Sequence, residues 1–178
     1  MSELAITVTK RDHLQGPLNA PCSLVEYGDY ECPACAEVEP IIRSLQNRFG
    51  DRLSLVFRNF PLQEIHPWAE PAAGVAEYAG RHGKFWEMHD LLFANQDRFN
   101  DITLRNLLEE LKLNHSDQQL AQSSVASRKR ISGDFEGGIR SGVNGTPTFF
   151  LNGERYGGKT DYESFAALLE LVLVSDGE

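Results

Sequence analysis

The chain has 178 residues, a formal net charge of −9 and a sequence isoelectric point near 5.0. Its hydrophobic fraction of 41% and charged fraction of 24% are those of an ordinary globular protein that buries its own core. An acidic surface is repelled by nucleic-acid phosphates and by anionic lipids, so we expect neither a nucleic-acid partner nor membrane binding. No apolar stretch reaches the length of a transmembrane helix.

The N-terminal residues lack the basic segment and apolar run of a secretory signal. We therefore expect a cytoplasmic protein, or a periplasmic one if a signal has been removed. The three cysteines are too few, and odd in number, for a disulfide framework. Two of them form Cys32-Pro33-Ala34-Cys35, whereas Cys22 stands apart and is expected to be a half-buried small hydrophobic residue.

The first half of the chain predicts a strand, a helix and a second strand. Residues 22–28 read as a buried strand, and residues 53–59 alternate as a second strand that Pro61 ends. Between them, residues 32–49 have helical character, with Pro33 tolerated in the first turn and Pro40 expected to kink the helix. This order predicts a βαβ unit with parallel strands.

The second half begins with a long helical stretch. From residue 67 to residue 141 the apolar periodicity is helical, and strand character returns at residues 147–151. Asn152-Gly153 favours a hairpin turn before a short strand around Arg155 and Tyr156. Asp161 is expected to cap a final amphipathic helix. The sequence thus predicts an α/β fold, with a core of residues 1–62 and 142–178 and an all-helical insertion at 63–141.

The Cys-x-x-Cys motif opens a predicted helix directly after a strand, which is typical of redox-active cysteines. A cysteine in the first turn faces unpaired backbone N–H groups and the positive end of the helix dipole, and both stabilise a thiolate. Cys32 takes that position, and Cys35 lies one turn deeper on the same face. The alternative, half of a zinc site, needs a second pair of ligands that the sequence does not supply.

The motifs ECPACAEVEPIIRSL after LVEYGDY, GKFWEMHDLLF and GVNGTPTFFLNG resemble those of DsbA-like members of the thioredoxin superfamily. The resemblance covers nearly the whole chain and implies a thioredoxin-like core interrupted by a helical domain. It implies dithiol–disulfide exchange with protein or small-molecule thiol substrates and an unidentified redox partner, without a metal or cofactor. Cys32 would attack and Cys35 would resolve, and the substrate-binding positions would be Pro33, Ala34 and the cis-proline loop Thr146-Pro147.

Glu26 matches the buried acid of this family, six residues before the first cysteine. A carboxyl group there should be partly desolvated, with a raised pKa, and could relay a proton to or from Cys35. Strand alternation also allows Glu26 to point toward solvent, because Val25 and Tyr27 share the opposite face.

Two features depart from the most oxidising relatives. Ala34 replaces the histidine that they carry between the cysteines, so it donates no hydrogen bond or charge to Cys32. Asp29 and Glu31 place negative charges just before Cys32, where they are expected to oppose its thiolate. Both features predict a less oxidising couple.

Three other interpretations accompany this one. The stretch Gly153 to Thr160 fits the phosphate-loop spacing and raises nucleotide binding as an alternative function. A non-enzymatic chaperone or interaction module on the same scaffold is the second alternative. The basic run Arg128-Lys129-Arg130 is expected to lie on a solvated helix face.

Overall fold

The computed structural model describes residues 3–113 and 124–175. At its centre is a five-stranded sheet with the strand order β1-β3-β2-β4-β5. The strands are β1 (His13–Gln15), β2 (Cys22–Gly28), β3 (Leu53–Asn59), β4 (Thr148–Leu151) and β5 (Glu154–Arg155). β2 and β3 pair in parallel, with Leu24 opposite Leu55, and the other neighbouring strands are antiparallel.

The predicted α/β fold and its parallel βαβ unit are confirmed. β2 and β3 occupy the predicted residues, and both are almost wholly buried because helices cover the two faces of the sheet. β1 was not predicted from the sequence. Its three residues are too few for a periodic signal, and the strand exists because it pairs with residues 55–57 of β3.

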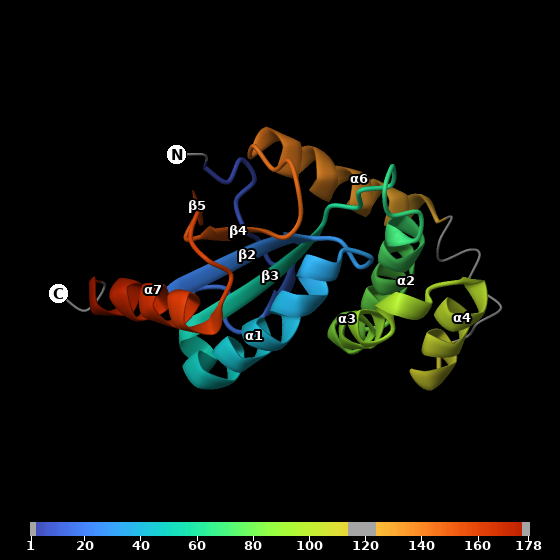
Figure 1. Ribbon diagram of the computed structural model, residues 1–178, viewed down its shortest axis with the longest axis horizontal. Coiled ribbons are helices and arrows are strands. Elements are labelled where there is room, and N and C mark those ends of the chain that lie inside the picture. The colour runs from blue at the N-terminus through green and yellow to red at the C-terminus, as the bar shows by residue number, and fades with distance from the viewer. Residues whose placement is uncertain (1–2, 114–123, 176–178) are drawn as a thin grey trace.

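Helices cover both faces of the sheet (Figure 1). α1 (Pro33–Phe49), which is continuous through Pro40, and α7 (Tyr162–Ser175) lie on one face, where Leu45 and Phe165 belong to one apolar cluster. A 3-10 turn, η1 (Gly50–Arg52), leads from α1 into β3. α6 (Val125–Arg140) lies on the other face, where Phe60 stacks on Phe135 at 4.4 Å between ring centroids.

The remaining helices pack together beside one end of the sheet (Figure 1). They are α2 (Ala69–Arg81), α3 (Phe85–Ala94), the 3-10 turn η2 (Gln96–Arg98) and α4 (Asp101–Glu110). Their apolar cluster includes Cys32 and Cys35, so this group of helices adjoins the cysteine motif. None of the helices in the described ranges combines the length and hydropathy needed to cross a bilayer.

The division into a core and an insertion at 63–141 stays a prediction. α6 falls within the predicted insertion, and it contacts both α2 and β3. Residues 114–123 of the predicted insertion lie outside the described residues.

Candidate active site

Cys32 is the N-cap residue of α1, in an extended conformation with φ −77° and ψ 119°. Pro33 takes the first helical position, where the missing N–H group costs no hydrogen bond. The carbonyl oxygen of Cys32 accepts hydrogen bonds from the N–H groups of Cys35 at 3.1 Å and Ala36 at 3.2 Å. The Cys32 sulfur therefore lies at the N-terminus of a helix of 17 residues, as the sequence predicted.

The two cysteines differ in burial. Cys32 is 6% exposed and Cys35 is fully buried, and both are reduced, as is the buried Cys22. The Cys32 thiol donates a hydrogen bond to the carbonyl oxygen of Thr146 at 3.3 Å. The Thr146–Pro147 peptide bond is cis. The loop before β4 thus lies against the cysteine motif, although 114 residues separate Thr146 from Cys32.

The predicted substrate-binding positions lie around this contact. Pro33 and Ala34 are exposed at the start of α1, while Thr146 and Pro147 are half-buried. The Oγ1 atom of Thr146 is buried and has no hydrogen-bond partner among the described residues. The structure therefore brings all four positions to the end of the sheet that carries Cys32.

The environment of Cys32 favours its thiolate. A hydrogen bond from the Cys35 thiol is the largest influence, and it lowers the pKa of Cys32 to about 5. Burial acts in the opposite direction, while the backbone N–H groups of Cys35 and Ala34 lower the pKa further. A group with this pKa is ionised at neutral pH and is the natural nucleophile of the pair.

The environment of Cys35 favours its thiol. Burial raises the pKa of Cys35 far above its ordinary value, and the hydrogen bond to Cys32 and the charge of Glu26 add to the increase. Glu26 is itself 5% exposed, and burial raises its pKa well above the usual range, with contributions from Glu39 and Cys32. The expected burial and raised pKa of Glu26 are confirmed, and the alternative in which it points to solvent is wrong.

A cavity of about 140 Å³, lined by both apolar and charged side chains, lies between β2, β3, α1 and α3. Glu26 lines it, and its Oε1 atom has no hydrogen-bond partner in the described part of the chain. His89 and Glu39 also line the cavity, and His89 Nε2 lies 3.1 Å from Glu39 Oε2. Arg43 and Asp90, which are about half-exposed, line it too and form an ion pair at 2.8 Å. The cavity is large enough for water and connects the buried acid to surface charges.

Asp29 and Glu31 both accept hydrogen bonds from backbone N–H groups. The Asp29 carboxylate accepts hydrogen bonds from the backbone N–H groups of Leu62 and Glu31, each at 2.8 Å. Glu31 accepts one from the N–H group of Trp68. The expected opposition of these two charges to the Cys32 thiolate stays a prediction, and the net effect of the surroundings is to lower the pKa of Cys32.

Gln96 is a site residue that sequence reasoning missed. Its Nε2 atom donates hydrogen bonds at 2.8 Å to the carbonyl oxygens of Tyr30 and Cys32. These hydrogen bonds connect η2, which contains Gln96, to the turn before α1. No local pattern around Gln96 indicates the role, because its partners lie 64 and 66 residues away.

The phosphate-loop interpretation of residues 153–160 is wrong. Gly153 lies in the turn between the antiparallel strands β4 and β5, with φ 89°, whereas a phosphate loop follows a strand directly into a helix. The ring of Tyr156 lies over Gly158, whose Cβ position is 2.4 Å from the Tyr156 hydroxyl oxygen. In residues 3–113 and 124–175, no three metal-ligating side chains gather into a possible metal site.

The fold and this site together define a thioredoxin-like protein with a cysteine pair at a helix start. The chain belongs to the thioredoxin family whose model, described as "Thioredoxin", matches residues 8–171.

Solved structures with this fold cover almost the whole chain. Oxidised BdbD from Bacillus subtilis is similar with a TM-score of 0.84 and 21% identity, over 97% of this chain and 98% of that one. Wolbachia pipientis alpha-DsbA1 has a TM-score of 0.80 and 18% identity, over 93% and 92% of the two chains. The expected DsbA-like fold is confirmed.

Closer relatives in sequence are much longer proteins. The chain is 44% identical over 160 residues to a Salinispora arenicola protein named Na(+)/H(+) antiporter NhaA 1, covering 88% of this chain and 24% of that protein. It is 39% identical to a protein of the same name from Mycolicibacterium gilvum, covering 90% and 26%. The chain thus spans about a quarter of the length of these relatives.

Proposed function

We propose that this chain is a thiol–disulfide oxidoreductase that exchanges the Cys32–Cys35 pair with protein or small-molecule thiols. The observation that carries the proposal is the difference between the pKa values of the two cysteines, which lie within one helical turn of each other. The pKa of Cys32 is lowered to about 5, while that of the fully buried Cys35 is raised. One sulfur is therefore ready to attack at neutral pH, and the other stays protonated until a mixed disulfide has formed.

In the reducing direction, the Cys32 thiolate attacks one sulfur of a substrate disulfide. A mixed disulfide forms, the substrate S–S bond breaks, and the first substrate sulfur leaves as a thiolate. Cys35 then loses its proton and attacks Sγ of Cys32, which releases the second substrate thiolate. The protein loses two electrons and the substrate gains them, and the oxidising direction reverses each step.

Glu26 is the proposed proton acceptor for Cys35. Its charge contributes to the raised pKa of Cys35, and its buried Oε1 atom has no hydrogen-bond partner among the described residues. The cavity that Glu26 lines gives the proton a route toward Glu39 and His89. A buried acid with a raised pKa is suited to accept and return a proton near neutral pH.

Pro33, Ala34, Thr146 and Pro147 are the proposed substrate-binding surface. They surround the Cys32 sulfur and are exposed or half-buried, so an extended chain can reach the sulfur along them.

A partner is suggested by the longer relatives. They are named as Na(+)/H(+) antiporters, and a segment like this chain makes up about a quarter of each. We infer that the domain works beside a membrane ion transporter, either acting on its thiols or using it as an anchor.

Turnover of a model disulfide tests the proposed chemistry. Cys32→Ser should abolish reduction of oxidised glutathione, and Cys35→Ser should accumulate a mixed disulfide visible by mass spectrometry. Cys22→Ala is the matched control and should keep the activity, because Cys22 begins β2 away from the motif. Full biological activity in a Cys32→Ser, Cys35→Ser double variant would instead favour the non-enzymatic module.

A further inference from the structure

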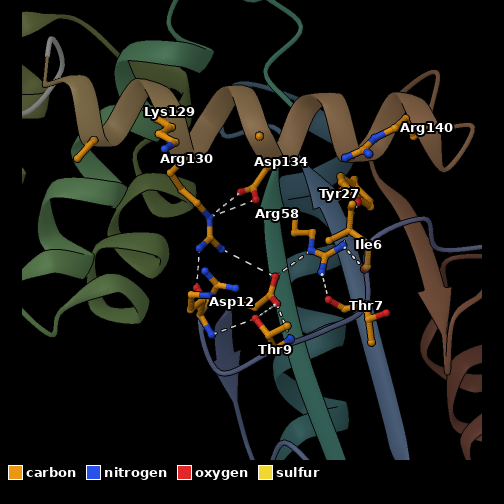
Figure 2. A pocket seen from close by; sticks show the side chains of 14 residues that line it. Ile6, Thr7, Thr9, Asp12, Tyr27, Arg58, Lys129, Arg130, Asp134 and Arg140 are labelled. Atoms are coloured by element: carbon orange, nitrogen blue, oxygen red, sulfur yellow. Dashed lines mark hydrogen bonds and ion pairs between the residues drawn. The ribbon is translucent and has the colours of Figure 1, made fainter.

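A second pocket lies on the face of the sheet covered by α6, between that helix and the N-terminal segment (Figure 2). Its volume is about 490 Å³, within the range of small-molecule sites. The charged residues that line it are Arg11, Arg58, Lys129, Arg130 and Arg140, with Asp12 and Asp134. The pocket thus concentrates positive charge in a chain whose net charge is −9.

The floor of the pocket is a network of two arginines and two aspartates. Arg58 is 2% exposed, and its Nε donates to Asp12 at 2.9 Å while its Nη1 donates to the Tyr27 hydroxyl at 3.0 Å. Arg130 pairs with Asp134 at 3.2 Å and reaches the carbonyl oxygen of Arg11. Figure 2 shows both acids turned toward these arginines. Asp12 and Asp134 are therefore already paired with the arginines of the floor. They do not neutralise the other basic side chains that line the pocket.

The rim carries the cations that remain. Arg11, Lys129 and Arg140 are exposed, and none of them has a side-chain ion pair or hydrogen bond to another residue of the described ranges. Lys129 and Arg140 project from opposite ends of the α6 face in Figure 2. Arg128 and Lys129 of the basic run are exposed as expected, whereas Arg130 is half-buried. Lys129 and Arg130 line this pocket, whereas Arg128 lines a separate groove on the other side of α6.

A glycine leaves room between these cations. A Cβ atom at Gly133 would meet no heavy atom within 4 Å, so this stretch of α6 faces open space. At Gly137, one turn later, a Cβ atom would lie 3.2 Å from the Ile6 side chain, so the pocket closes there. Ile6 and Ala126 add apolar lining, which suits a ligand with an organic portion as well as charge.

We propose that this pocket, with Arg11, Lys129 and Arg140 at its rim, binds a small organic phosphate. Arginine and lysine together match phosphate oxygens in geometry and charge. The volume exceeds what a bare phosphate ion fills, and the apolar lining accommodates the group that the phosphate is attached to. This site lies on the opposite face of the sheet from the cavity at Glu26, so it is independent of the redox chemistry.

Calorimetric titration of the purified protein with inorganic pyrophosphate tests the site. Saturable binding is expected at low ionic strength, and it should weaken as salt is added. Lys129→Ala and Arg140→Ala should each weaken binding about fivefold, the effect of losing one exposed charge contact. Arg128→Ala removes the same charge from the same helix outside the pocket, and it should leave binding unchanged.

Gly133→Glu is the decisive variant. Its side chain enters open space, so the fold should be retained, and its carboxylate should pair with the rim cations and abolish pyrophosphate binding. A retained circular dichroism spectrum and retained thiol–disulfide activity establish that this variant is folded. Absence of saturable binding to the wild-type protein overturns the proposal. So does binding that Gly133→Glu leaves intact, or that Arg128→Ala weakens as much as Arg140→Ala does.

Discussion

Asp29 holds His66 by a hydrogen bond of 2.8 Å between Oδ2 and Nδ1, and the Asp29 side chain is fully buried. The same carboxylate accepts the backbone N–H group of Leu62. Asp29 precedes Cys32 by three residues, and the segment from Leu62 to His66 leads into α2. This contact therefore fixes the helical group next to the cysteine motif.

Replacing Asp29 with alanine should loosen this connection. The change leaves the N–H groups of Leu62 and Glu31 without their acceptor, and each unsatisfied buried group costs about 1–3 kcal/mol. We expect the free energy of unfolding to fall by about 3 kcal/mol in urea titrations, with faster hydrogen exchange at Leu62. Glu64→Ala, in the same segment, is the control and should change neither quantity. Unchanged exchange at Leu62 in the Asp29 variant would contradict this role.

The lowered pKa of Cys32 makes alkylation and stability depend on pH. Labelling of the reduced protein with limiting iodoacetamide should modify Cys32 first, with a rate that rises around pH 5. Because the folded pKa is depressed, the thiolate stabilises the folded reduced protein above the ordinary thiol pKa, and this stability is lost as pH falls toward 5. The oxidised protein has no such group. The unfolding free energy of the reduced protein should therefore fall relative to that of the oxidised protein as pH decreases from about 9 to about 5.

Mass spectrometry of the labelled peptides and urea titrations at each pH measure both effects. Preferential labelling of Cys35 or Cys22 would contradict the assignment of Cys32 as the nucleophile. Cys32→Ala gives the baseline, because its unfolding free energy should lack this part of the pH dependence.

The sequence predicts the local features of this fold and site but not the contacts between distant segments. The strand at residues 22–28 and the helix start at Cys32 follow from periodicity and from one motif. The burial of Glu26 was implied by the resemblance to DsbA-like proteins, whereas strand alternation left it open. The contacts of Gln96 with Cys32 and of Asp29 with Leu62 were missed because these partners lie more than 30 residues away. Electrostatic effects depend on such partners, so the sequence alone did not show that the Cys35 thiol is the largest influence on the pKa of Cys32.

Replacing Glu26 with glutamine should raise stability and slow turnover. Burial raises the folded pKa of Glu26, so the folded state binds a proton more tightly, and stability falls as pH rises from the unfolded pKa toward the folded one. Each unit of raised pKa corresponds to about 1.4 kcal/mol, and the neutral amide avoids this loss. We expect a higher unfolding free energy at pH 7 and a flatter pH profile in urea titrations.

The same variant lacks the proposed proton acceptor for Cys35. Turnover with oxidised glutathione should fall about tenfold or more, in keeping with the loss of one acid–base group. Glu37→Gln, on the exposed side of α1, should leave stability and turnover unchanged. A Glu26 variant with normal turnover and an unaltered pH–rate profile would refute the proton-transfer role.

Ala34→His should make the couple more oxidising. A couple is oxidising when its reduced form is stabilised, chiefly by a low nucleophile pKa. The Cys32 pKa of about 5 lies between about 7 for thioredoxin and about 3.5 for DsbA, which places the potential near −180 mV, at the upper end of the thioredoxin-to-isomerase range. Ala34 is exposed beside Cys32 and adds no charge, whereas an imidazolium there would stabilise the thiolate.

A shift of one pKa unit in Cys32 corresponds to roughly 30 mV for this two-electron couple, so the change is measurable. Equilibration in glutathione buffers followed by thiol trapping gives the potential, and the pH dependence of alkylation gives the pKa. Ala36→His is the matched control, because residue 36 lies beyond the cysteine pair and is only partly exposed. It should move both quantities less than Ala34→His does. A wild-type potential of about −120 mV would show that a group other than those around Cys32 stabilises the thiolate. If Ala34→His had the same potential as the wild-type protein, residue 34 would have no effect on the Cys32 thiolate.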